Sequence, residues 1–369
     1  MTASEAWLYV VAVLATVAAL LWWRMRSAGH AQRFVLPLVD DETKDAQLRV
    51  LEIVDELMGK IQSAPITRRL ATNRKALDEA FGETSRNPDS LGVRIEEVEV
   101  CGVQAEWVLG PNSDPNRRML YLHGGSWVSG SRLSHRTLTA ALAKRTGLSV
   151  LVPEYRLMPE NKRRDGIEDC QNAYRWMLDH GPGLAGKPTD VFVAGDSAGG
   201  NLALMLTAWI RDNALRQVDG AVALSPATDG TIRGRSLRTN LRTDVMLGPA
   251  FEPLVRLPSS VRWLATLMTA RADPRNPIIS PLYGNLADLP PTLVHVSESE
   301  MLLDDARNYV RRAQDQGSPV VLQTWPSMVH VWHMFTGILP QADEALGEIE
   351  KFVGSCSNSQ PANNRLLRL

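Results

Sequence analysis

Apolar and polar positions follow two different rhythms along most of the chain. Eight stretches are continuous apolar runs or apolar–polar alternations typical of β-strands: 93–100, 104–109, 119–122, 148–152, 191–194, 221–224, 292–296 and 320–325. Between the later ones, apolar residues recur at helical spacing, at 134–146, 166–180, 198–215 and 303–316. This alternation predicts an α/β fold with an eight-stranded, mostly parallel, doubly wound sheet, and the first two strands predict an antiparallel edge.

Three intervals depart from this rhythm. Apolar residues recur at helical spacing in 44–61, which predicts an amphipathic helix. Residues 226–290 carry no clear strand and are rich in apolar side chains between 247 and 270. This interval is longer than an ordinary crossover, so it predicts an inserted element that covers something. Residues 354–369 are expected to form a flexible tail.

The N-terminal residues contain an uncharged apolar run. It extends from Ala6 to Trp23, and a helix of that length spans roughly 27 Å, close to the thickness of a bilayer's hydrocarbon core. Aromatic residues lie near both ends of the run, and Arg24 and Arg26 follow it directly. We therefore expect residues 1–26 to form a single-pass membrane anchor, with the rest of the protein on the cytoplasmic side. A cleaved signal peptide and a buried packing helix are the alternatives.

Composition excludes several classes of protein. The 369 residues include 40 basic and 41 acidic side chains, which gives a net charge of −1. Without a basic excess, no nucleic-acid partner is expected. Cys101, Cys170 and Cys356 are too few and too scattered for a disulfide scaffold or a zinc site, and no metal or cofactor is expected.

The clearest chemical motif is GDSAGG, at 195–200. It directly follows the run 191–194 and leads into the helical pattern of 198–215. A G-x-S-x-G sequence between a strand and a helix is the nucleophile elbow, in which glycines permit a sharp turn that exposes the serine hydroxyl. A plain glycine-rich turn or a phosphate-binding loop is the alternative, but the flanking strand and helix argue against it. We expect Ser197 to be a nucleophile.

A serine hydroxyl needs a base to take its proton. Seven histidines are available, and only His330 and His333 follow the last predicted strand. That position agrees with the chain order serine, acid, histidine expected for this kind of sheet. His330 lies in a loop at the carboxyl end of a strand, from which a base can reach Ser197, whereas His333 begins a helical pattern. We therefore favour His330, with His333 as the alternative.

The acid that orients the histidine is expected after the run 292–296. The segment SESEMLLDDA offers four carboxylates there: Glu298, Glu300, Asp304 and Asp305. The two aspartates begin a helix and are explained as partners of its N-terminal dipole. Glu298 and Glu300 lie in the loop and suit the orienting role, but the residues alone separate the four poorly.

A third motif, YLHGGSW at 121–127, supplies oxyanion donors. A strand that ends in His-Gly-Gly presents the backbone N–H groups of Gly124 and Gly125 to a developing oxyanion. With the N–H of Ala198, the residue after the serine, these groups predict an oxyanion hole.

Together these segments resemble the hormone-sensitive-lipase-like branch of the α/β-hydrolase esterases, bacterial family IV, over residues 95–353. The similarity is carried by HGGSW, PEYRLMPE at 153–160, GDSAGG, DPRNPIISPL at 273–282, SESEMLLDDA and VHVWHMF at 329–335. Within this branch the chain is most similar to sequences described as monoterpene ε-lactone hydrolases and acetyl-hydrolases. The resemblance implies an α/β-hydrolase catalytic domain over 93–353. It also implies a cap over the site, made of a helical N-terminal segment, 27–92, and an insertion at 226–275.

The resemblance also implies roles for single residues. The family's nucleophile and histidine fall on Ser197 and His330, and its acid falls on Glu300, where aspartate is commoner. The implied oxyanion donors are Gly125, Ser126 and Ala198, with Ser126 in place of a third glycine.

The implied function is hydrolysis of hydrophobic short-to-medium esters or lactones through an acyl-enzyme, without a metal or cofactor. Apolar residues in 247–270, such as Phe251, Trp263 and Met268, favour a hydrophobic substrate. An amidase or deacetylase with the same triad is the main alternative, and a non-catalytic small-molecule receptor on the same fold is another. A homodimer is compatible with this composition.

Overall fold

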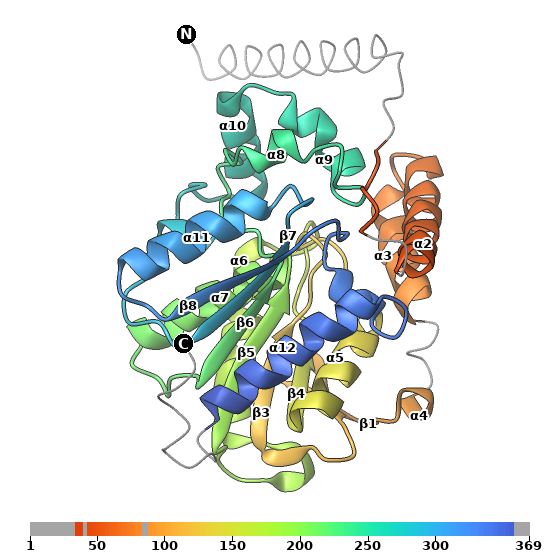
Figure 1. Ribbon diagram of the computed structural model, residues 1–369. Helices are drawn as coiled ribbons and strands as arrows, with labels where there is room; N and C mark the ends of the chain where they lie inside the picture. The colour runs from red at the N-terminus through yellow and green to blue at the C-terminus, as the bar shows by residue number, and fades with distance from the viewer. Residues whose placement is uncertain (1–33, 40–42, 83–87, 358–369) are drawn as a thin grey trace.

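A computed structural model describes residues 34–39, 43–82 and 88–357 of the chain. Its centre is an eight-stranded sheet in the order β1-β2-β4-β3-β5-β6-β7-β8 (Figure 1). The strands are β1 (Arg94–Val100), β2 (Val103–Leu109), β3 (Asp114–Leu122), β4 (Leu148–Pro153), β5 (Asp190–Asp196), β6 (Gly220–Leu224), β7 (Thr292–Ser297) and β8 (Val320–Trp325). β2 pairs antiparallel with β1 and β4, and the other neighbours are parallel. The predicted mostly parallel sheet with an antiparallel edge is confirmed.

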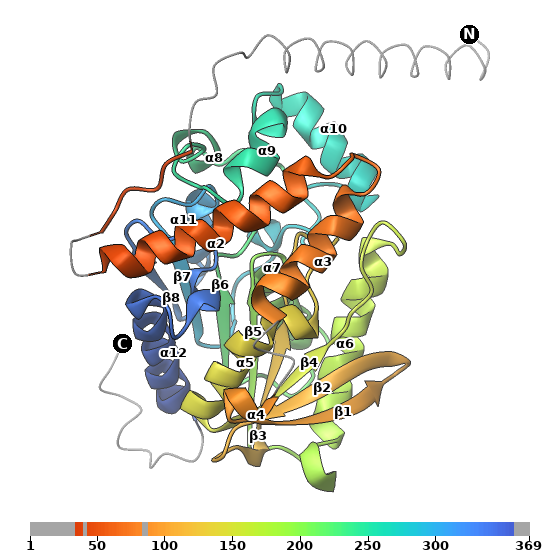
Figure 2. The same cartoon turned by 90° about the vertical axis from the view of Figure 1, so that its right-hand side faces the viewer.

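Helices cover both faces of this sheet. One face carries α6 (Arg163–Asp179), α7 (Ala198–Asp212) and α11 (Leu303–Asp315). The other face carries α5 (Arg132–Thr146) and α12 (Pro340–Cys356) (Figures 1 and 2). Because both faces are covered, the parallel strands are buried on both sides and their sequences are continuous apolar runs.

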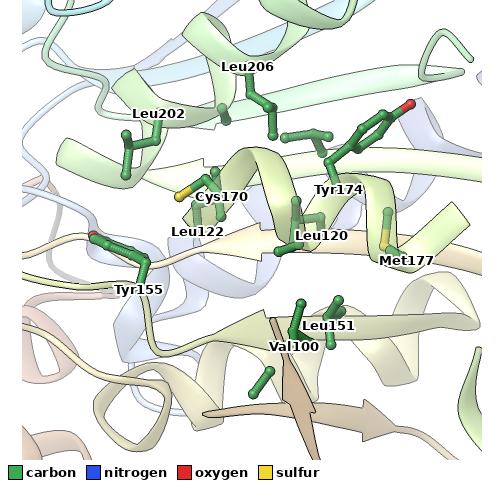
Figure 3. Packing of buried hydrophobic residues seen from close by; sticks show 14 of the residues in the cluster. Val100, Leu120, Leu122, Leu151, Tyr155, Cys170, Tyr174, Met177, Leu202 and Leu206 are labelled. Carbon is green, nitrogen blue, oxygen red and sulfur yellow. The ribbon is translucent and has the colours of Figure 1, made fainter. Parts of the chain in front are cut away.

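The side chains of β3 show how the strands divide between the two faces. Leu120 and Leu122 pack in the layer of α6 and α7, next to residues such as Cys170 (Figure 3). Met119 and Tyr121 pack in the layer of α5 and α12. Successive strand residues point to opposite faces, so a shift of register by one residue would exchange the two layers.

β3 is longer than the apolar run 119–122, because its first half is polar. Arg117 forms an ion pair with Asp190 at 2.8 Å, and the buried Arg118 donates to the carbonyl oxygens of Pro115 (2.8 Å) and Met177 (2.6 Å). These side chains have partners inside the protein, so charged residues extend the strand beyond the apolar pattern.

Two groups of helices lie above the carboxyl ends of the parallel strands (Figures 1 and 2). α2 (Lys44–Ser63) and α3 (Arg69–Gly82) form one group. α8 (Ser236–Thr239), α9 (Gly248–Val255) and α10 (Ser259–Ala270) form the other. We call these five helices the cap. α2 agrees with the helix predicted at 44–61, and the interval 226–290 contains no strand, as predicted.

The shorter elements and the chain ends complete the description. The short helices are α4 (Pro88–Leu91), η2 (Pro182–Leu184), η3 (Pro281–Tyr283) and η4 (Trp332–Phe335). α12 continues to Cys356, so the predicted tail begins three residues too early: apolar packing of Val353 holds the last helical turn in place.

The anchor predicted at 1–26 lies outside the described residues. Within the described residues, no helix has both the length and the apolar character needed to cross a membrane.

Candidate active site

Ser197 occupies a strained turn between β5 and α7. Its backbone has φ 52° and ψ −114°, a conformation that residues other than glycine rarely adopt, and its N–H donates to Leu224 O at 2.7 Å. The turn lies tightly against β3: a Cβ atom on Gly199 would be 1.9 Å from Leu122 O. A glycine is therefore required where the turn meets the sheet, which explains the motif around the serine.

His330 and Glu300 form a buried pair close to this turn. His330 Nδ1 lies 2.6 Å from Glu300 Oε2. The other oxygen of Glu300 accepts hydrogen bonds from Ser225 Oγ (2.7 Å) and from the N–H of Ser297 (2.8 Å). The carboxylate is thus held by two strand ends, and it fixes the orientation of the imidazole ring.

The surroundings of His330 favour its protonated form. Burial by itself lowers the pKa of His330, but the charge and hydrogen bond of Glu300, together with the charges of Asp244 and Asp196, outweigh burial and raise the pKa above its usual value. An imidazolium that forms during a reaction is therefore stabilised in place.

The structure separates the four carboxylates that follow β7. Only Glu300 contacts His330, whereas Glu298 is exposed and accepts from Thr324 Oγ1 at 3.1 Å. Asp304 accepts the backbone N–H of Ser236, the first residue of α8, at 2.8 Å, and Asp305 accepts those of Thr228 (2.8 Å) and Asp229 (2.9 Å) in the segment before α8. The two aspartates hold the base of the cap, a role that their position at a helix start does not reveal.

His333, the alternative base, lies in the core. Its Nε2 is 3.1 Å from Nδ1 of His295, and burial lowers the pKa of both histidines, that of His295 to about 3. His333 lines neither of the cavities at Ser197. The preference for His330 agrees with this arrangement.

Two cavities meet at Ser197. The smaller, of about 190 Å³, is lined by Ser197, His330, Gly125 and apolar side chains of α2 and α3, among them Leu57, Met58, Ile61, Leu77 and Phe81. The larger, of about 490 Å³, lies under α9 and α10 and is lined by Ser197, Ala198, Trp127, Arg163 and cap residues such as Leu254. Ser126, Leu247 and Phe251 line both cavities. The cap therefore encloses the serine between two largely apolar spaces.

The loop after β3 brings backbone N–H groups to these cavities. Gly125 has φ 115°, and a Cβ atom there would lie 2.1 Å from Ser129 O, so only glycine fits. Ser126 has φ 56°, in the left-handed region that a serine can adopt. Within the described residues, the N–H groups of Gly125 and Ser126 have no acceptor. Ala198 begins α7, so its N–H also lacks an acceptor in the helix.

Gly124 does not join these donors. Its N–H donates to Asp196 Oδ1 at 3.0 Å, and the residue lines neither cavity. The prediction that Gly124 contributes to the oxyanion hole is therefore wrong, because the carboxylate beside Ser197 already occupies its N–H.

That carboxylate, Asp196, is the centre of a buried network that sequence reasoning missed. Tyr121 OH donates to Oδ1 at 2.8 Å, and His135 Nε2 lies 3.3 Å from Oδ2. Burial by itself raises the pKa of Asp196, but the charge and hydrogen bond of His135 and the hydrogen bond of Tyr121 lower it below its usual value. The network ties the oxyanion loop to the nucleophile turn; an aspartate next to the serine was the only local signal for it.

No group of three or more His, Cys, Asp or Glu residues that could hold a metal ion is found in the part of the chain that the structure describes. The site is built from a serine, a histidine–glutamate pair and free backbone N–H groups. Such an arrangement can activate a hydroxyl and stabilise an oxyanion, which are the requirements of acyl transfer.

Comparison with known proteins agrees with this chemistry. Residues 119–334 match a family model described as the alpha/beta hydrolase fold. The chain is 38% identical over 305 residues to an acetyl-hydrolase of Streptomyces hygroscopicus, an alignment that covers 80% of this chain and 93% of that protein. It is 31% identical to an esterase of Acinetobacter venetianus, which covers 82% of this chain and 95% of that protein.

Solved structures give the same result. The crystal structure of an esterase from the bacterial hormone-sensitive lipase family superimposes with a TM-score of 0.73 at 32% identity, over 86% of this chain and 98% of that one. Fold and site thus define a serine hydrolase of the α/β-hydrolase class. More narrowly, the chain belongs to the hormone-sensitive-lipase family, and it is a carboxylesterase. The family resemblance seen in the sequence motifs is confirmed.

Proposed function

We propose that this carboxylesterase hydrolyses hydrophobic short-to-medium esters and lactones through an acyl-enzyme on Ser197. The observation that carries the proposal is the 2.6 Å contact between His330 Nδ1 and Glu300 Oε2, next to a cavity that both His330 and Ser197 line. A proton held on Nδ1 by Glu300 leaves Nε2 free to accept one from the serine. No hydrogen bond joins Ser197 to His330 in the described residues, and such bonds often form only when substrate binds.

The reaction has two steps. First, His330 takes the proton of Ser197, Ser197 Oγ attacks the substrate carbonyl carbon, and His330 returns the proton to the leaving alcohol as the carbon–oxygen bond breaks. The N–H groups of Gly125, Ser126 and Ala198 stabilise the oxyanion of the tetrahedral intermediate. Water then attacks the acyl-enzyme by the same route and releases the acid.

The two cavities support a substrate with an apolar group on each side of the carbonyl. The acyl and alcohol parts of a linear ester leave the carbonyl in different directions, and spaces of about 490 and 190 Å³ meet at Ser197. Their apolar walls favour hydrocarbon over charged groups at most positions. The similarity to lactone hydrolases in the sequence motifs supports lactones as further substrates.

Hydrolysis of a p-nitrophenyl ester series tests this function. We expect activity from acetate to medium-length acyl chains with an optimum, loss of activity in Ser197→Ala, and a strong reduction in Glu300→Gln. A matching p-nitroanilide series tests the amidase alternative. A folded protein that hydrolyses none of these substrates and is not labelled on Ser197 by a fluorophosphonate would contradict the proposal.

We also propose that residues 1–26 anchor the enzyme in a membrane, with the catalytic domain on the cytoplasmic side. The uncharged run from Ala6 to Trp23 and the arginines that follow it support this topology. We expect the full chain to stay in the membrane fraction after an alkaline wash, and a chain lacking residues 1–26 to be released. Full-length protein in the soluble fraction would contradict the anchor, and digestion of the catalytic domain from the outside of intact cells would contradict the orientation.

A further inference from the structure

Arg163 is a buried cation in the wall of the larger cavity. It begins α6, only 7% of it is exposed, and it lines the same space as Ser197 and Ser126. Burial lowers the pKa of Arg163 to about 9, so the side chain stays charged at neutral pH. A charge in an apolar wall costs free energy unless something compensates it.

The protein compensates this charge only in part. Arg163 Nη2 donates to Asn201 Oδ1 (3.2 Å) and to Ile279 O (3.1 Å), and the guanidinium carbon lies 3.7 Å from the centre of the Trp127 ring. Within the described residues, Arg163 forms no ion pair, its Nε is buried without an acceptor, and both of its side-chain hydrogen bonds come from Nη2. A cation at the first residue of a helix is also opposed by the helix dipole.

Neighbouring acids do not supply the missing partner. Asp169, on the same helix, is paired with Arg156 at 2.7 Å. Asp305 and Asp229 line the same cavity, but each accepts hydrogen bonds from its own surroundings, Asp305 from Thr228 N–H and Asp229 from Thr231 Oγ1 at 2.6 Å. Burial and the charge of Asp229 raise the pKa of Asp305, which favours the uncharged form of this carboxyl. Among the described residues that line this cavity, Arg163 is the only cation, and it has no ion-pair partner.

We propose that Arg163 is a specificity-determining residue, and that the larger cavity binds esters that carry a carboxylate at the end of an apolar chain. The proposal rests on the hydrolytic function of Ser197 proposed above. The apolar walls contact the chain, and the Nη1 group of Arg163 donates charge-assisted hydrogen bonds to the carboxylate. A neutral ester of the same length would leave the buried guanidinium without a partner, so the enzyme would favour the acidic substrate.

Matched pairs of substrates test this preference. One pair compares mono-p-nitrophenyl adipate with p-nitrophenyl heptanoate, whose acyl chains have the same number of non-hydrogen atoms along their length: the adipate ends in a carboxylate where the heptanoate ends in an ethyl group. A second pair carries the charge on the alcohol side: the acetate ester of a terminal hydroxypentanoic acid and hexyl acetate. The measured quantity is the ratio of kcat/KM for the acidic ester to kcat/KM for the neutral one. Half-esters from glutarate to suberate locate the chain length that reaches Arg163.

We expect a ratio above one for the wild type in one of the two pairs, which identifies the side of the ester that enters the larger cavity. Arg163→Met should lower that ratio at least about tenfold, and Arg163→Lys should lower it less, because a lysine keeps the charge. Arg262→Met is the matched control. Arg262 is also buried and also lacks an ion pair in the described residues, but it lies on α10 outside both cavities, so its loss should not change the ratio.

The outcomes separate the two proposals. A wild-type ratio below one in both pairs at every chain length overturns the role of Arg163, even if no variant folds. An unchanged ratio in folded Arg163→Met does the same. In either case, hydrolysis of the neutral esters would still support the function of Ser197, whereas no hydrolysis of any ester would contradict that function itself.

Discussion

The carboxylate of Asp244, in the segment between α8 and α9, accepts a hydrogen bond from the backbone N–H of Met301 at 2.9 Å. Met301 directly follows Glu300, so this bond joins the cap to the loop that carries the acid. The other oxygen of Asp244 accepts the N–H of Leu247 at 2.8 Å, at the start of α9, and Leu247 lines both cavities. The position of the cap and that of the acid are therefore coupled through one buried side chain.

Replacing Asp244 should loosen this coupling. Asp244→Ala leaves the N–H groups of Met301, Leu247 and Met246 without this acceptor, and the bond from Met301 is fully buried. We therefore expect a loss of about 1–3 kcal/mol in the free energy of unfolding and a lower kcat/KM. Urea unfolding and ester hydrolysis measure the two effects. Asp114→Ala is a suitable control, since the half-buried Asp114 carboxylate accepts a local hydrogen bond from the N–H of Asn116 (2.8 Å) and lines neither cavity. Equal effects from both substitutions would argue against a special role for Asp244.

The rate should depend on pH through His330. Neutral imidazole is needed to take the serine proton, and the pKa of His330 is raised, so kcat/KM should rise with pH through a midpoint above 6.5, the usual histidine value. Glu300→Gln removes the charge that raises this pKa. We therefore expect the midpoint to move to lower pH while the plateau falls roughly 100-fold or more.

Glu298→Gln provides the control for that experiment. Glu298 is two positions away, exposed, and bonded to Thr324 rather than to His330. The pH dependence of kcat/KM in Glu298→Gln should match that of the wild type. A midpoint that moves in Glu298→Gln but not in Glu300→Gln would show that Glu298, and not Glu300, is the acid that orients His330.

Gly125→Ala should disrupt the oxyanion loop. The added Cβ would lie 2.1 Å from Ser129 O at a φ of 115°. The loop must therefore move, and its N–H groups would no longer point at the oxyanion. We expect kcat to fall about 100-fold or more. Gly183→Ala is the control for positive φ alone, because Gly183 has φ 60° and no atom near its Cβ position, in η2 away from the site. A fully active Gly125→Ala enzyme would exclude this loop as the source of the donors.

Tyr121→Phe should weaken the network around Asp196. The substitution removes the donor to a buried carboxylate oxygen, at a cost of about 1–3 kcal/mol in the free energy of unfolding. Tyr309→Phe is its counterpart, since the hydroxyl of Tyr309 is buried without a hydrogen-bond partner in the described residues. That second change should be neutral or stabilising. Thermal or urea unfolding of both variants decides whether the Tyr121–Asp196 bond stabilises the fold.

Much of the fold follows from local patterns. The parallel strands correspond to apolar runs because each is buried on two faces. The helical pattern of 134–146 ends where α5 ends, at Thr146, and Gly147 follows with a left-handed φ of 66°. β3 is the exception, since the partners that allow Arg117 and Arg118 inside the protein come from distant segments. Polarity alone does not reveal such partners.

The roles of Ser197 and His330 can be predicted from the sequence. A strand, a glycine turn and a helix follow one another locally around the serine, and the histidine follows the last strand. The choice of Glu300 over Glu298 required the family resemblance or the tertiary structure: Ser225, on another strand, and His330 are what distinguish two glutamates in one loop. Gly124 shows the same limit, since its N–H is taken by Asp196, 72 residues later. Local sequence determines which groups are present and how the backbone turns. Only the packed structure decides which of them are already paired, because hydrogen bonds and buried charges find their partners across the fold.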